Sequence, residues 1–78
     1  MMLKEKVFKI VSQVMNVPFK EVNERSSSDN LGRWDSLQHI NLILALEEEF
    51  KIKFTAEEIA QMGNVSIILD ILQNKVTS

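Results

Sequence analysis

The segment from Ser36 to Phe50 most constrains the fold, because its apolar side chains cover most of a helical circumference. At about 100° per residue, it forms a deep apolar stripe, a narrower polar stripe and two border positions, Leu37 and Leu44. The deep stripe comprises Ile40, Ile43, Leu46 and Phe50, and the polar stripe comprises Gln38, Asn41, Glu48 and Glu49. A helix this apolar must pack on several neighbours. We therefore expect it to be the central helix of a bundle.

A helix start signal stands immediately before this segment. Asp35 occupies the N-cap position, and Gln38, three residues later, completes the pattern of a capping box. Ser36 is then the first helical residue, with its hydroxyl at the positive end of the helix dipole. Free backbone N–H groups at a helix start favour negative charge. Ser36 is therefore a candidate for covalent attachment of an anionic group.

Another amphipathic helix is expected near the beginning of the chain, over residues 2–15. Apolar residues recur there at spacings of three and four, namely Leu3, Val7, Ile10, Val11 and Val14. Pro18 ends this helix, because proline disfavours a helical conformation at the residue before it. No helical period survives from there to Trp34, and a loop this long in a small domain is often functional. Its apolar residues are expected to anchor it to the core: Phe19, Val22, Leu31 and Trp34.

Two more helices are expected after a short linker. The Thr55–Glu58 capping box opens a short helix that runs through Met62 and stops at Gly63. Asn64 caps the last helix, expected over residues 65–76. The predicted fold class is all-α: a small four-helix bundle with three longer helices, a short third helix and a long loop between the first two.

Length and composition exclude several classes of protein. With 78 residues, we expect one domain, residues 1–78, around one small core. The net charge of -2 and the pI near 5.3 argue against nucleic-acid binding. The absence of cysteine fits a reducing compartment. No apolar run approaches the roughly 18 residues that span a bilayer, and the N-terminus lacks the apolar core of a signal peptide. We expect a monomeric, cytoplasmic protein with no membrane insertion.

The Asp-Ser-Leu run at 35–37, followed by an apolar helix ending Ala-Leu-Glu-Glu-Glu-Phe at 45–50, resembles the acyl carrier protein family. The first helix, the long loop, the short third helix and the start of the last helix fall in register as well. The resemblance implies that Ser36 carries 4′-phosphopantetheine, transferred from coenzyme A by a separate Mg²⁺-dependent phosphopantetheinyl transferase. It also implies that Asp35 helps to position the serine for the transferase. The thiol of the arm then holds an acyl group as a thioester.

In such a carrier the chemistry is done by acyl-transferring, ligating or synthase enzymes, so the protein itself is not expected to be an enzyme. The family's acidic second helix docks onto basic patches of its partners. The segment from Trp34 to Phe50 has four acids and no Lys or Arg, which is consistent with electrostatic steering. Partner contacts are therefore expected at Leu37, Leu44, Glu47 and Glu48, although the two leucines are equally interpretable as core residues.

Other interpretations of the same residues carry less weight. Asp35, Ser36 and His39 suggest a hydrolase triad, but the chain offers no oxyanion hole and no strand-to-helix elbow. His39 is more simply a surface or half-buried side chain, and Trp34 a loop anchor. A metal site is not expected from the glutamates alone.

Two questions stay open at the level of sequence. An acyl chain can tuck between the helices of fatty-acid carriers, and the matching positions here would belong equally well to a filled core: Ile43, Leu46, Ile59, Met62 and Ile68. The moderate net charge, Trp34, Gln38 and Asn41 look more like a specialised discrete carrier of polyketide, nonribosomal-peptide or modified-sugar pathways. The alternative functions are an aminoacyl or peptidyl carrier, such as a D-alanyl carrier, and an unmodified helical interaction module.

Overall fold

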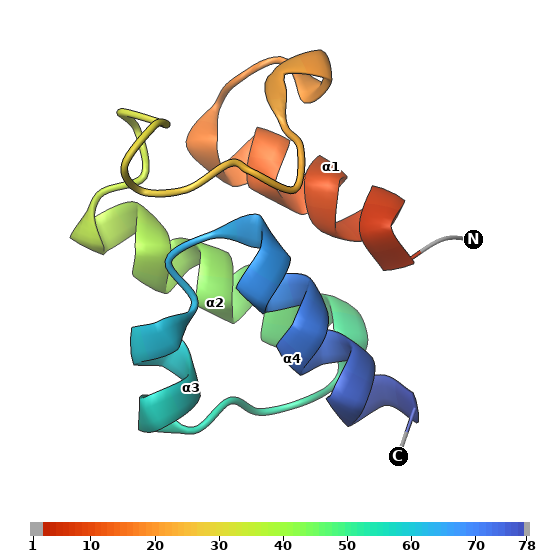
Figure 1. Ribbon diagram of the computed structural model, residues 1–78. Helices are drawn as coiled ribbons and strands as arrows, with labels where there is room; N and C mark the ends of the chain where they lie inside the picture. Colours follow the sequence, from red (N-terminus) through yellow and green to blue (C-terminus); the bar gives the residue numbers. More distant parts are fainter. Residues whose placement is uncertain (1–2, 78) are drawn as a thin grey trace.

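The computed structural model describes residues 3–77, and the helices of this part of the chain confirm the all-α class (Figure 1). The helical elements are α1 (Leu3–Met15), the 3-10 turn η1 (Phe19–Glu21), α2 (Ser36–Phe50), α3 (Ala56–Gln61) and α4 (Val65–Thr77). Each helix lies within two residues of its expected bounds. Met2, included in the expected first helix, lies outside the described residues.

The helix ends follow the expected local chemistry. Beyond α1, Asn16 adopts a left-handed conformation with φ 58°, which asparagine tolerates better than most residues. At α3 the capping box is complete: the Thr55 hydroxyl accepts from the Glu58 N–H at 3.1 Å, and the Glu58 carboxylate accepts from the Thr55 N–H at 2.9 Å. The Asn64 side chain accepts from the Ile67 N–H at 2.8 Å and so caps α4 as expected.

The core lies between α1, α2 and α4, and α1 packs against both other helices. Its fully buried residues come from all three helices and from the α3–α4 junction: Val7, Val11, Met15, Leu42, Leu46, Met62, Val65, Ile68 and Leu72. The expected deep stripe of α2 was wrong at one position, because Ile40 is 50% exposed while Leu42 is completely buried. The neighbours of α2 cover only one side, so this wide apolar surface is not enclosed as expected.

The long loop is held against the helices by buried side chains and by backbone hydrogen bonds. Val22 and Trp34 are buried and Leu31 is half-buried, as expected, but Phe19 is 50% exposed, with its ring in a T-shaped contact with the Phe8 ring. The sequence did not predict that the loop also forms backbone hydrogen bonds to the α3–α4 junction. There the Ser28 N–H donates to the Gly63 carbonyl at 3.0 Å, and the Val65 N–H donates to the Ser26 carbonyl at 2.9 Å.

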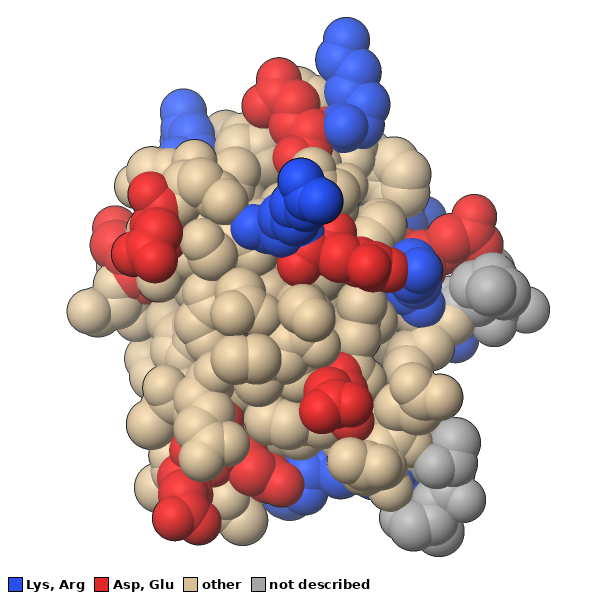
Figure 2. Space-filling model, viewed as in Figure 1, with Lys and Arg blue, Asp and Glu red and all other residues tan. Residues whose placement is uncertain are grey.

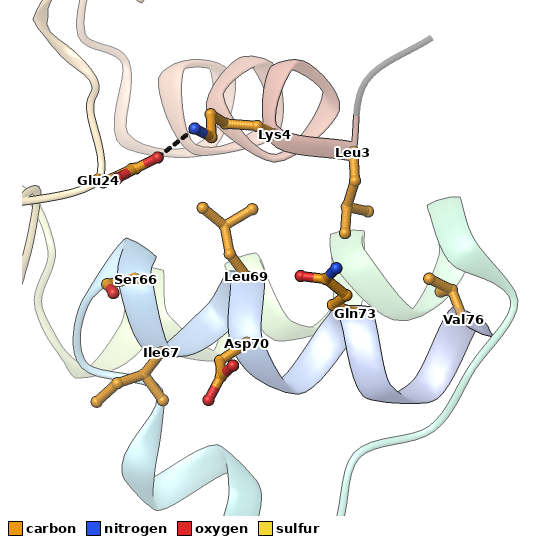
Figure 3. A pocket seen from close by; sticks show the side chains of 9 residues that line it. All are labelled: Leu3, Lys4, Glu24, Ser66, Ile67, Leu69, Asp70, Gln73 and Val76. Atoms are coloured by element: carbon orange, nitrogen blue, oxygen red, sulfur yellow. Dashed lines mark ion pairs between the residues drawn. The ribbon is translucent and has the colours of Figure 1, made fainter. Parts of the chain in front are cut away.

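In Figure 2 acidic and basic side chains are scattered around a largely uncharged centre, and no continuous basic patch is visible on this face. A shallow hollow of about 740 Å³ lies between the start of α1 and α4. Figure 3 shows the Lys4–Glu24 ion pair bordering it, with Leu69, Gln73 and Val76 presented by α4. No helix among residues 3–77 is long and apolar enough to cross a membrane.

Candidate functional site

Ser36 is exposed and is the first residue of α2. Figure 1 shows the long loop entering α2 at this end of the helix. The preceding Asp35 is extended, with φ -98° and ψ -174°, and its Oδ1 accepts from the Gln38 N–H at 2.9 Å. The expected capping box is only half formed, because the Gln38 side chain accepts from the Asn41 amide at 2.8 Å instead of reaching back to Asp35. The backbone N–H groups of Ser36 and Leu37 belong to the first helical turn, where no intrahelical acceptor exists.

His39 lies one turn further along α2 and has hydrogen-bond partners at both ring nitrogens. The indole Nε1–H of Trp34 lies 3.0 Å from His39 Nδ1, and His39 Nε2 lies 2.9 Å from the carbonyl oxygen of Ile59 in α3. The two rings are nearly parallel, with an interplanar angle of 25° and centroids 6.2 Å apart. Both nitrogens are thus engaged away from Ser36, so the geometry gives Ser36 no general base in His39. From the sequence, Trp34 was interpreted as a loop anchor and His39 as a surface or half-buried side chain, and the contact between them was not predicted.

A hollow of about 540 Å³ borders Ser36 between the start of α2 and α3. We call it the Ser36 hollow; its lining residues are Ser28, Trp34, Asp35, Ser36, His39, Ile40, Ala60 and Gly63. Asp35 is the only acidic residue among them, and its carboxylate is already occupied by the Gln38 N–H. An exposed hydroxyl beside free helix-terminal N–H groups suits a phosphodiester, and the open hollow leaves space for a group attached there.

Three apolar side chains of α2 are exposed on one face of the helix. Leu37 is 70% exposed, Ile40 is 50% exposed and Leu44 is 59% exposed. At 100° per residue they fall within about 60° of one another around the helix axis. We call these three residues the α2 stripe. It adjoins Ser36, and it includes Ile40, which the sequence had wrongly assigned to the core.

The two predicted contact glutamates differ in their surroundings. Glu47 is half-buried, and its carboxylate accepts from the Phe54 N–H at 2.9 Å, which holds the α2–α3 linker. Glu48 is exposed on the same side of the helix as Leu44. Glu49 lies 3.9 Å from the ammonium of Lys6 on α1. Glu48 is therefore better placed than Glu47 to meet a partner.

Four of the five possible acyl-chain neighbours are core residues in this structure. Ile43, Leu46, Met62 and Ile68 are buried, and Ile59 is half-buried at the edge of the same cluster. The Ser36 hollow is lined by none of them. Among the described residues no group of three or more His, Cys, Asp or Glu side chains is placed to hold a metal ion.

Comparison with known proteins assigns the family. Residues 5–72 match the model of the phosphopantetheine attachment site. The chain is 41% identical over 75 residues to the acyl carrier protein of Thermosynechococcus vestitus, covering 95% of this chain and 91% of that protein. The chain belongs to the acyl carrier protein family.

Two further relatives agree with this assignment. The acyl carrier protein of Buchnera aphidicola from Acyrthosiphon pisum is 36% identical over 74 residues, covering 94% of this chain and 91% of the relative. The solution structure of the holo acyl carrier protein of Geobacter metallireducens superposes with a TM-score of 0.84 at 31% identity, covering 97% of this chain and 88% of that one. Acyl carriers of this family use covalently bound phosphopantetheine.

Proposed function

We propose that residues 1–78 form a single carrier domain in which 4′-phosphopantetheine is attached to Ser36 and carries acyl intermediates as thioesters between biosynthetic enzymes. The observation that carries the proposal is the exposed Ser36 hydroxyl at the capped start of α2, within the region that matches the phosphopantetheine attachment site. When bound, the group supplies a terminal thiol that this cysteine-free chain lacks.

The role of the chain in attachment is to present one oxygen atom. Ser36 Oγ forms a new bond to the β-phosphorus of coenzyme A, the phosphoanhydride bond breaks, and 3′,5′-ADP leaves. The serine proton passes to a base of the transferase, since His39 is engaged elsewhere. Asp35 holds the first turn of α2 rigid by capping the Gln38 N–H, which fixes the direction in which Ser36 leaves the helix.

The attachment is tested by intact mass after incubation with coenzyme A, Mg²⁺ and a broad-specificity phosphopantetheinyl transferase. We expect the wild type to gain one phosphopantetheinyl unit and Ser36→Ala to gain none. Ser28→Ala is the matched control, because Ser28 is also exposed and lines the same hollow. Absence of a gain in the wild type, or a gain in Ser36→Ala, would contradict the proposal. The mass of the loaded protein from its native host distinguishes an acyl from an aminoacyl cargo.

The docking surface for the transferase and for acyl-transferring, ligating or synthase enzymes is the α2 stripe together with Glu48. This assignment is supported by the position of the stripe next to Ser36 and by its exposure. A partner that covers these three side chains removes apolar surface from water as it approaches the attachment residue. Glu47 contributes less, because its carboxylate is committed to the Phe54 N–H.

A further inference from the structure

A hydrogen-bonded chain beside Ser36 has no part in the proposed attachment chemistry. It runs from the indole of Trp34, through the imidazole of His39, to the backbone of Ile59. Trp34 is 4% exposed and lies one residue before the Asp35 cap. Ile59 lies in α3, next to Ala60, which lines the Ser36 hollow. The chain therefore links the loop, α2 and α3 at the end of the bundle that presents Ser36.

The donors and acceptors determine the protonation state of the imidazole. An indole N–H can only donate, so His39 Nδ1 must accept and carries no proton. A backbone carbonyl can only accept, so His39 Nε2 must donate to Ile59 and carries the proton. His39 is thus the neutral Nε2–H tautomer in this arrangement. Protonation would place an N–H at Nδ1, 3.0 Å from the Trp34 indole nitrogen, where two donors would oppose each other.

We propose that His39 is a positioning residue: its neutral form joins Trp34 to α3 and so fixes the turn that presents Ser36, and its protonation, which leaves the Nε2–H bond to Ile59 intact, releases Trp34. The release requires only a second proton on the imidazole, at Nδ1, where the indole N–H now donates. The hydrogen bonds of His39 to Trp34 and Ile59 do not depend on any group attached to Ser36. Only its consequence for loading rests on the proposed attachment at Ser36.

Other charged groups near the contact must be separated from His39. In sequence, the charged residues within two positions of the three contact residues on these elements are Arg33, Asp35, Glu57 and Glu58, and Glu58 pairs with Thr55 and Lys75. Ordinary carboxylates titrate well below the range of histidine, and arginine stays charged throughout. His39 is the only histidine of the chain and Trp34 the only tryptophan, so each gives a single, unambiguous signal.

The test is a pH titration of the unmodified protein from pH 8 to pH 5, followed by ¹H–¹⁵N NMR at the Trp34 indole and the Ser36 amide. We expect both resonances to shift with the midpoint at which the His39 ring itself titrates. His39→Gln should remove the transition from both signals. An indole resonance that does not move while His39 titrates, or a transition that persists in His39→Gln, would overturn the proposal.

Trp34→Phe separates positioning from the direct effect of a charge. It retains a buried aromatic ring and the titrating imidazole but removes the N–H donor. If the Trp34 contact transmits the change, the Ser36 shift should be clearly smaller in Trp34→Phe than in the wild type. An equal Ser36 shift in both proteins would mean that the imidazolium acts only through space and would overturn the positioning role. This comparison remains decisive if His39→Gln fails to fold.

Loading by the transferase gives a functional readout at one fixed pH, where titration of the transferase is common to all variants. At pH 7.5 we expect kcat/KM for His39→Gln to fall about fivefold, the equivalent of one hydrogen bond of about 1 kcal/mol. An unchanged kcat/KM would contradict the positioning role in loading. The wild-type mass gain is measured first: its absence would count against attachment at Ser36, while the NMR titration would still decide the role of His39.

Discussion

At the residue scale, Asp35 stabilises α2 through a single side-chain hydrogen bond. Its carboxylate satisfies the Gln38 N–H, one of the donors that a helix start leaves without a backbone partner. The reciprocal half of the capping box is missing, since Gln38 pairs with Asn41. The start of the helix that presents Ser36 therefore depends on one residue and offers a direct test.

We expect Asp35→Ala to lower the free energy of unfolding by about 1 kcal/mol, the usual cost of removing an N-cap. Asp35→Asn is the matched control, because asparagine also accepts the Gln38 N–H and should cost much less. Urea unfolding followed by circular dichroism measures both. Equal destabilisation by alanine and asparagine would show that the charge matters and that the cap does not.

Glu58 gives a pH-dependent contribution at the same scale. The hydrogen bond from the Thr55 backbone N–H, followed by the nearby Lys75 ammonium, holds the pKa of Glu58 below its ordinary value of 4.5. Because the folded-state pKa is lowered, the stabilisation is complete above the unfolded pKa and is lost as the pH falls through the folded one. In Glu58→Gln, the free energy of unfolding should therefore fall less steeply than in the wild type as the pH decreases below about 4.5.

The matched control for this prediction is Glu57→Gln, which changes an exposed neighbour on the same turn of α3. Thermal unfolding between pH 3 and pH 7 provides the measurement. If both variants lose stability at low pH as the wild type does, or if both are changed equally, the interactions of Glu58 with Thr55 and Lys75 do not explain the loss of stability at low pH.

At the element scale, α2 is a helix with two apolar faces. Leu42, Ile43 and Leu46 are buried, whereas Leu37, Ile40 and Leu44 remain in water. Exposed apolar side chains that lie together near a functional residue commonly mark an interaction surface. The polar residues between the two faces keep the exposed stripe separate from the core, so it can be changed without disturbing the fold.

Substitutions on this helix should separate apolar from electrostatic docking. Leu44→Ala should weaken binding to the transferase at every salt concentration, because the lost contact is apolar, whereas Glu48→Lys should weaken it more at low than at high salt. Glu47→Gln is the control and should have little effect on binding. Surface plasmon resonance at two ionic strengths measures all three. A salt-independent effect of Glu48→Lys would argue against steering.

At the scale of the whole molecule, the long loop is joined to the folded structure both in its middle and at the end that enters α2. It is joined to the α3–α4 junction through Ser26 and Ser28, and it reaches α2 through Trp34, whose indole bonds to His39. Segments held by buried contacts and backbone hydrogen bonds open together with their neighbours. The loop therefore connects the Ser36 end of α2 to the start of α4.

Amide hydrogen exchange should show this connection. We expect the Ser28 and Val65 amides, which donate across the junction, to exchange at similar and slow rates. The amide of the exposed turn residue Arg33 should exchange much faster. If Ser28 exchanged as fast as Arg33, the loop would not be held as the structure indicates.

The sequence alone determined the class of the fold, the approximate bounds of all four helices and the position of Ser36 at a capped helix start. These features follow from local rules: helical periodicity, cap residues and the effect of proline act over a few neighbouring residues. The same rules identified Val22 and Trp34 as loop anchors, which the structure confirms.

Tertiary structure decided what local rules could not. The apolar residues of α2 cover so much of its circumference that periodicity could not say which side its neighbours would occupy, and Ile40 was therefore assigned to the wrong face. Gln38 and Phe19 were misjudged for a similar reason, since their partners depend on which groups come near after folding. The Trp34–His39–Ile59 contact joins residues up to 25 positions apart, from 34 to 59, and only the packing of α3 beside α2 brings them within hydrogen-bond distance.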